Sequence, residues 1–511
     1  MLMKQLLRRS GLAAVALAAL LSAAIGGAAL AQSGTRTDLV MIQGGSDPGT
    51  WDIVNSGISD TIRPIYLNVV EPLIYLQPDG TFAPGLAEEW SVSADGLVLT
   101  FQIREAKFHN GDPVTAGDVV FSLEAMSKSP VSRSRAPFGN MDSIVAQDDR
   151  TVVITLKRPS RPFVKAMAER QGLVHSAAAY AGIAQKPIGS GPYQVAEYVQ
   201  DSHLKLVRNP DYWGEAPEIE TVMIRFIPDS TAAINAMLAG EADAFLGMQP
   251  ETYERITSQG LDRRFRVTAF DEGGLIGIMR LNRFRPPLDD IRLRQAVAYS
   301  LDRASVVSVF GADFAFTVAC TYGTSNQPWF KPESEETCVY PGPNREKAQA
   351  LLKEAGYDGT PIVFSYINNW AEAEIIAAQM EAAGLVIQRD PRERSNYSTN
   401  VIGIIPPPTD INMTYTTGAM GQFAAARPDA TYTFNEEYNG LLQQAETATS
   451  YEAEIDLMSR ANRILQEDAV VITFTTRSHV GIMSNDLVGW EDRFFSPGES
   501  RYNFPAVTWR Q

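Results

Sequence analysis

Hydrophobic and polar residues alternate on both sides of a turn signal early in the chain. Trp90 and Val92 alternate with polar residues, and Asp95–Gly96 is a dipeptide typical of tight turns. The alternation then continues on one face of a second strand, made of Leu97, Leu99, Phe101 and Ile103. The pattern predicts a β-hairpin.

A helical pattern follows this hairpin. Pro113 ends the extended run, and Thr115 and Asp118 have the spacing of a capping box, in which two residues satisfy each other's backbone N–H groups. Apolar residues then recur at helical period, namely Val119, Leu123 and Met126. The pattern predicts a capped helix.

Strand-like and helix-like patterns alternate along the rest of the chain. The strand-like runs include Thr151–Leu156, Val222–Ile227, Ile362–Ile367 and Val470–Thr475. Helical faces follow Asp289–Asp290 (Leu293, Ala296, Val297, Leu301) and Asn344 (Ala348, Leu351, Leu352, Ala355). A chain of 511 residues with this alternation is too long for one core and predicts two or three α/β domains.

Six motifs, in a fixed order, resemble those of one bacterial family. They are residues 84–124, Pro187–Tyr193 (PIGSGPY), Arg208–Gly214 (RNPDYWG), Gly240–Asp243 (GEAD), Pro287–Arg303 and Lys353–Tyr357 (KEAGY). Together they resemble family 5 of the bacterial extracellular solute-binding proteins, which hand peptides, nickel complexes and related solutes to ABC importers. We expect the motif residues to be scaffold, because their glycines and prolines form turns and their apolar residues form helix faces.

The resemblance implies an α/β fold, a bilobed periplasmic-binding-protein clamshell with an extra subdomain in lobe I and a two-crossover hinge. The implied parts are a signal peptide (1–31), lobe I (32–67), its extra subdomain (68–186), the second part of lobe I (187–283), lobe II (284–484) and the C-terminal part of lobe I (485–511). The crossovers are expected near Leu281–Asn282 and near Asp486. Closure about such a hinge buries a ligand between the lobes.

The N-terminus has the pattern of a secretory signal peptide. Lys4, Arg8 and Arg9 precede an almost wholly apolar run, and Ala29–Ala31 is a small-residue cleavage site. A membrane anchor is the alternative, but the run consists mostly of alanine and contains Gly26–Gly27. We expect cleavage after Ala31 and a periplasmic protein without a lipid anchor, because no cysteine lies near the site.

Charge and composition limit the partners. Removing the signal takes off three positive charges and no negative ones, so the net charge changes from −16 to −19. An acidic protein is poorly suited to nucleic acid or anionic membranes. The expected partners are therefore a small solute and an inner-membrane ABC permease, with no direct membrane insertion, and the protein is expected to be a monomer.

The cysteines and histidines indicate a disulfide but no metal site. Cys320 and Cys338 lie in the exported part of the chain and are expected to pair, closing a loop worth about 3 kcal/mol. The four histidines are His109, His175, His203 and His479. They show no metal-ligand spacing with one another or with the cysteines, so no metal and no cofactor are expected.

In the family that the chain resembles, peptide binders hold the free α-amino group with a carboxylate that follows a strand of lobe II. The matching stretch here is residues 410–422, and no acidic residue lies between Met413 and Ala426. A buried ammonium without a counter-charge costs several kcal/mol. Either another acid, such as Asp47, approaches from elsewhere, or the solute has no free amine.

The candidate ligand contacts come from four places. Trp51 follows the first strand, Asn369–Trp370 opens a helix whose N–H groups can receive an anion, and residues 415–418 lie at a strand end. Nearby arginines, namely Arg389, Arg392, Arg394 and Arg427, suit carboxylates or phosphates. The predicted ligand-binding residues are Asp47, Trp51, Asn369, Trp370, Arg394, Tyr415, Thr416, Thr417, Gly418 and Arg427.

These features predict the substrate-binding protein of an ABC importer, with a dipeptide or oligopeptide as its solute. The alternative solute is a non-peptide anion such as an opine, a modified peptide or a metal chelate, because the amine-binding carboxylate is missing. An enzyme is not expected, since the chain lacks the G-x-S-x-G, H-E-x-x-H, P-loop and Rossmann motifs. Presentation of the solute to a chemoreceptor remains open beside transport.

Overall fold

The computed structural model describes residues 36–44, 47–56, 63–77, 80–248, 263–310, 316–323, 337–368, 370–397, 409–416, 435–448, 450–489, 495–496, 499–500 and 504–510. The chain divides into two units, Met1–Thr37 with Gln511 and Asp38–Arg510, and all described helices and strands lie in the second. The predicted signal peptide lies outside the described residues. Within the described residues, no helix combines the length and the apolar character that a membrane span requires.

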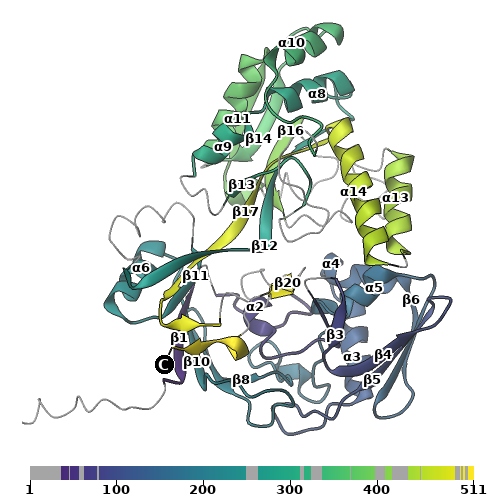
Figure 1. Cartoon of the computed structure of the whole chain (residues 1–511), viewed down its shortest axis with the longest axis vertical. Coiled ribbons are helices and arrows are strands. Elements are labelled where there is room, and N and C mark those ends of the chain that lie inside the picture. The colour runs from purple at the N-terminus through teal and green to yellow at the C-terminus, as the bar shows by residue number, and fades with distance from the viewer. Residues whose placement is uncertain are drawn as a thin grey trace, which may run out of the picture. The chain divides into compact units, whose positions relative to one another are not determined.

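The largest sheet has 11 strands, in the order β15-β14-β16-β12-β17-β11-β1-β10-β9-β8 with β13 paired to β17 (Figure 1). Its strands are β1 (Asp38–Gln43), β8 (Tyr193–Val199), β9 (His203–Arg208), β10 (Thr221–Phe226), β11 (Ala244–Met248), β12 (Phe265–Leu281), β13 (Phe316–Val318), β14 (Ile362–Ile367), β15 (Ile387–Arg392), β16 (Ile411–Thr416) and β17 (Val471–Ser484). The two long strands, β12 and β17, are antiparallel neighbours. They connect the strands around β1 with those around β14.

A separate antiparallel sheet has four strands in the order β4-β5-β7-β6. These strands are β4 (Ala87–Val92), β5 (Val98–Ile103), β6 (Met141–Ala146) and β7 (Thr151–Leu156). The predicted hairpin is β4–β5, and Gly96 takes the positive φ of 71° that its turn requires. Three strand pairs complete the β-structure, β2–β3 (Ile74–Leu76, Phe82–Pro84), β18–β21 (Leu487–Val488, Thr508–Trp509) and β19–β20 (Phe495–Ser496, Glu499–Ser500).

Several helices begin where the sequence places capping residues. The α-helices are α2 (Arg63–Tyr66), α3 (Ala116–Ser127), α4 (Ser132–Arg135), α5 (Arg161–Ala166), α6 (Ser230–Ala239), α8 (Ile291–Ser300), α9 (Arg303–Ser308), α10 (Arg345–Glu354), α11 (Ala371–Ala382), α12 (Arg394–Tyr397), α13 (Glu436–Glu446) and α14 (Tyr451–Asp468). Thr115 and Asp118 form the predicted capping box at α3. Asp290 and Asn344 cap α8 and α10 with their side chains, which confirms those two predicted helices.

Apolar faces of these elements meet in two large hydrophobic cores. One core packs β1, β8, β9 and β10 together with the four-stranded sheet, and includes Leu39, Phe101 and Tyr193. The other lies between strands β12, β14 and β16 and helices α8 to α11, and includes Phe364 and Met413. The second core therefore fixes one face of β16, which carries the predicted ligand residues Tyr415 and Thr416.

The motif residues pack on one another around a buried carboxylate. Glu71 is fully buried, and its Oε2 accepts hydrogen bonds from Ser190 Oγ at 3.1 Å and Trp213 Nε1 at 2.7 Å. Asn209 Nδ2 donates to the carbonyl of Gly191 at 3.0 Å. These contacts tie the PIGSGPY and RNPDYWG motifs together, which gives both motifs a structural role.

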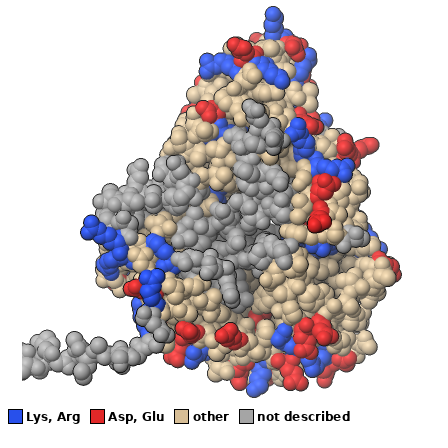
Figure 2. All heavy atoms as spheres, viewed as in Figure 1, with Lys and Arg blue, Asp and Glu red and all other residues tan. Residues whose placement is uncertain are grey.

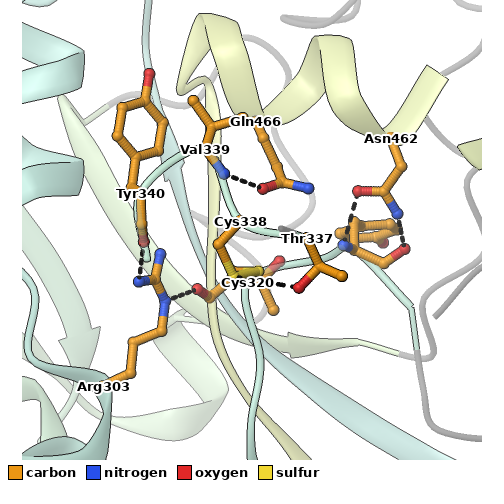
Figure 3. The surroundings of a disulfide bond; sticks show 10 residues. Arg303, Cys320, Thr337, Cys338, Val339, Tyr340, Asn462 and Gln466 are labelled. Carbon is orange, nitrogen blue, oxygen red and sulfur yellow. Dashed lines mark hydrogen bonds between the residues drawn. A yellow bond between two sulfur atoms is a disulfide. The ribbon is translucent and has the colours of Figure 1, made fainter. Parts of the chain in front are cut away.

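The predicted disulfide is confirmed. Cys320 and Cys338 are bonded, with 5.7 Å between their Cα atoms. Helix α14 holds both ends of the enclosed segment (Figure 3). The Asn462 side chain accepts from Tyr322 N at 3.0 Å and donates to its carbonyl at 2.7 Å, and Gln466 Oε1 accepts from Val339 N at 3.1 Å.

Candidate functional site

Three parallel strands end at the same edge of the large sheet. β14 is parallel to β15, with Ile367 opposite Arg392, and is also parallel to β16. α11 begins four residues after β14 ends, and α12 begins two residues after β15 ends. In α/β sheets, ligands bind beyond the carboxyl ends of such strands, where loops and helix N-termini meet. We call this edge, formed by the carboxyl ends of β14, β15 and β16, the strand-end site.

Aromatic side chains cluster at the strand-end site. The ring of Trp370 packs edge-to-face on Tyr415, with 5.3 Å between ring centroids, and on Tyr397, with 6.1 Å. Tyr415 also packs on Phe474 of β17, at 6.1 Å. Trp370 and Tyr415 are both partly exposed, so the cluster offers apolar ring surface together with hydroxyl groups. The structure thus brings together two predicted residues that lie 45 positions apart, and Thr416 follows Tyr415 directly.

A carboxylate and a guanidinium flank Tyr415. Its hydroxyl donates to Oε1 of Glu372 at 3.0 Å, and Glu372 is only 4% exposed. The guanidinium carbon of Arg477, on β17, lies 6.0 Å from the centroid of the Tyr415 ring. A carboxylate at the hydroxyl and a guanidinium near the ring can together orient a solute that carries both charges.

Sequence reasoning missed Glu372 and Arg477. Glu372 lies in the first turn of the helix that Trp370 opens, so the search for an acid could have included it. Arg477 lies in the middle of β17, beyond the predicted strand Val470–Thr475, and nothing local indicates its contact with Tyr415. Both contacts join segments that are far apart in the sequence and that the large sheet brings together.

Two of the four arginines that motivated an anionic solute form ion pairs with neighbouring acids. Arg389 binds Glu381 through both terminal nitrogens, at 2.5 and 2.9 Å, and Glu374 through Nε at 3.0 Å. These bonds raise the pKa of Arg389 further above its usual value and lower the pKa of Glu381. Arg392 Nε donates to Asp390 at 2.7 Å. Neither of these arginines needs a solute anion for its charge to be balanced.

The loop after β1 holds the two predicted residues from the N-terminal part of the chain. The carboxylate of Asp47 accepts from Tyr198 Oη at 2.6 Å, from Asp201 N at 2.7 Å and from Gly49 N at 2.8 Å. Trp51 is only 1% exposed and packs on Tyr198 at 5.5 Å. Asp47 thus shapes its own loop and Trp51 belongs to the first hydrophobic core; a ligand role for either stays a prediction.

The remaining predicted ligand residues cannot be placed. Asn369, Thr417, Gly418 and Arg427 lie outside the described residues. Arg394 begins α12, but its side chain is not described. Their roles therefore stay predictions.

A family model matches residues 81–404, which is more than half of the chain. Its description is bacterial extracellular solute-binding proteins, family 5. The chain belongs to this family. An ABC transporter peptide-binding protein of Brucella ovis, so named, is 28% identical over 358 residues, 65% of this chain and 66% of its own length. The match thus spans just under two thirds of that relative.

Solved structures share the fold over nearly the whole chain. A peptide complex of DppA from Helicobacter pylori has a TM-score of 0.73 and 22% identity, covering 93% of this chain and 99% of that one. MoaA of Agrobacterium tumefaciens in complex with mannopinic acid has the same TM-score and identity, covering 93% and 100%. The predicted family and the bilobed α/β periplasmic-binding-protein fold class are thereby confirmed.

Proposed function

We propose that this protein is the periplasmic substrate-binding protein of an ABC importer, and that it captures a dipeptide or oligopeptide without changing it chemically. The family match over residues 81–404 carries this proposal. The inner-membrane permease is the proposed recipient of the solute, and the exported protein is proposed to act as a monomer.

Glu372 supports a solute with a free amino group. It is a buried carboxylate in contact with Tyr415, at the end of the strand after which the family's peptide binders place their acid. We propose that Glu372 supplies the counter-charge that residues 413–426 lack. Asp47 lies in the loop after β1, where its carboxylate accepts three hydrogen bonds.

A non-peptide anionic solute is the second candidate. Arg477 beside Tyr415 favours it, because a guanidinium on a tyrosine ring can receive a carboxylate from the solute. Arg389 and Arg392 are paired with acids, so these two arginines no longer favour an anionic solute.

The long strands support a refined hinge. We keep the extra subdomain at 68–186 and the end of lobe II at 484 as proposals, and change only the start of lobe II, which the resemblance implies at 284. The pairing of β12 with β17 is interrupted between Phe270 and Leu275, and β12 pairs with β16 only from Ile276 onward. We therefore propose that the first crossover lies at residues 271–274, ahead of the position near Leu281 expected from the sequence.

Native mass spectrometry of protein taken from a periplasmic extract tests the function. After denaturation, the released molecules are identified. Peptides with free amino termini would support the first candidate, and a single small polyanion would support the second. Cleaved products after incubation with a peptide mixture would contradict a purely binding role.

A further inference from the structure

A row of polar side chains crosses four strands of the large sheet. Asp390 of β15 is opposite Ser365 of β14, Ser365 is opposite Asn412 of β16, and Asn412 is opposite Arg280 of β12. Facing residues of neighbouring strands project to the same side of a sheet. Ser365 Oγ donates to Asp390 at 2.5 Å, and Arg280 Nε donates to Asn412 Oδ1 at 2.8 Å.

The row carries a buried positive charge in excess. Ser365 and Asn412 are fully buried, and Arg280 is 8% exposed. The one carboxylate of the row, on Asp390, is bound to Arg392 at 2.7 Å. Among the described residues, no acid forms an ion pair with Arg280. A buried guanidinium without a counter-charge is costly, by several kcal/mol.

Within the described part of the chain, two donors of the row have no hydrogen-bond partner. They are Nη2 of Arg280 and Nδ2 of Asn412, and both atoms are buried. The bond between Arg280 Nε and Asn412 Oδ1 keeps the two side chains together. Leaving two buried donors unsatisfied costs about 1–3 kcal/mol each. Any group that satisfies both must be an acceptor.

Charge distinguishes the possible acceptors. A water molecule would accept both hydrogen bonds but would leave the positive charge of Arg280 uncompensated. An anion accepts both hydrogen bonds and also compensates that charge. We propose that Arg280 and Asn412 form a binding site for a small anion, a halide ion or a carboxylate oxygen, on this face of the sheet.

Tyr397 connects this anion site to the strand-end site. Its hydroxyl donates to the carbonyls of Ser365 and Met413, at 3.0 and 2.5 Å, and its ring packs on Trp370. Met413, whose carbonyl accepts from Tyr397, directly follows Asn412, which accepts from Arg280. The anion can therefore come from the medium or be a carboxylate of the captured solute. The inference itself does not depend on which solute the protein transports.

Anion-dependent stability is the test. Wild-type protein is exchanged into a buffer whose only anion is bulky, and thermal unfolding is followed while chloride, bromide or acetate is added. A rise in Tm that grows with the logarithm of the anion concentration above Kd is expected, reaching about 1–2 °C when the anion is at about ten times its Kd. Bromide in crystals should give an anomalous peak within reach of Arg280 and Asn412.

Substitutions separate this site from general salt effects. Asn412→Asp supplies a carboxylate beside Arg280, so it should remove the anion response and keep Tm high without added anion. Arg280→Met should also remove the response. Arg389→Gln, which alters an arginine of the same sheet that already has acidic partners, should retain it.

The outcomes are distinct. Loss of the response in Asn412→Asp with retention in Arg389→Gln supports the site, and release of bromide when solute binds identifies the solute carboxylate as its occupant. An equal response in wild type and Asn412→Asp, or no rise in the Tm of wild type on adding the anion, overturns it. Solute binding measured on the same samples shows whether the transport function stands independently.

Discussion

Buried histidines make stability depend on pH at the scale of single residues. Burial lowers the pKa of His175 to about 4, although Asp52 acts weakly in the opposite direction. Burial likewise lowers the pKa of His109 to about 4. His175 bonds to the hydroxyl of Tyr66 at 3.0 Å, and His109 contacts the carbonyl of Gly191 at 3.0 Å. Both histidines are therefore neutral in the folded protein at pH 5–7.

We expect the free energy of unfolding to fall as the pH drops from about 6.5 to 4. In that range the unfolded chain binds protons at these histidines and the folded protein does not, so each site removes up to about 3 kcal/mol. Urea unfolding at a series of pH values measures the slope. His175→Gln should reduce the slope between pH 6.5 and 5, and an unchanged slope would contradict this explanation.

Partnership also decides which charged residues remain available for a solute. Arg389 looks in the sequence like an anion receptor, but Glu374 and Glu381 of α11 hold it in place. Glu372, two positions before Glu374, contacts Tyr415 instead. Residue type alone does not distinguish these cases, because the partner of each charge is set by the helix and strand packed beside it.

At the scale of elements, local sequence signals are sufficient to predict short helices and turns. The capping box of Thr115 and Asp118 and the turn at Gly96 appear where their sequences predict them. The 17-residue strand β12 could not be predicted in this way. The polar stretch at residues 271–274 interrupts its apolar pattern, so only pairing with the distant β17 shows that the strand continues.

The disulfide between Cys320 and Cys338 is expected to stabilise the folded protein. Its closed loop has a sequence separation of 18 residues, so joint replacement Cys320→Ser and Cys338→Ser should lower the free energy of unfolding by about 3 kcal/mol. Urea unfolding of the double variant and of wild type measures the difference. Wild type with dithiothreitol should match the variant, and equal stability with and without the bond would contradict the prediction.

At the scale of the whole molecule, α14 contacts a segment almost 300 positions away. Arg161 of α5 donates through Nε to Glu454 at 2.5 Å, and its guanidinium lies 5.6 Å from the ring centroid of Tyr451. Figure 1 shows the ends of α13 and α14 near α5. A Cβ on Gly80 would overlap the ring of Tyr451, so the packing there is close. On the face drawn in Figure 2, acidic and basic side chains are interspersed.

Arg161→Met should weaken the contact between α5 and α14. The free energy of unfolding should fall by about 1–2 kcal/mol, because a half-buried ion pair and a cation–π contact are lost. Hydrogen exchange should rise in the first turns of α14 and at residues 80–82. Arg158→Met is the matched control, because Arg158 bonds Glu446 at 3.4 Å with 64% of its side chain exposed. Equal exchange in both variants would contradict a coupling role for Arg161.

We expect the strand-end site to capture the solute. The most direct measurement is calorimetric titration of the solute released from periplasmic protein into ligand-free wild type, Tyr415→Ala and, as control, Tyr357→Ala. Tyr357 bonds the carbonyl of Thr360 and has no contact with the cluster among the described residues. We predict at least tenfold weaker binding for Tyr415→Ala alone, which corresponds to about 1.4 kcal/mol. Equal affinity in all three proteins would contradict this expectation.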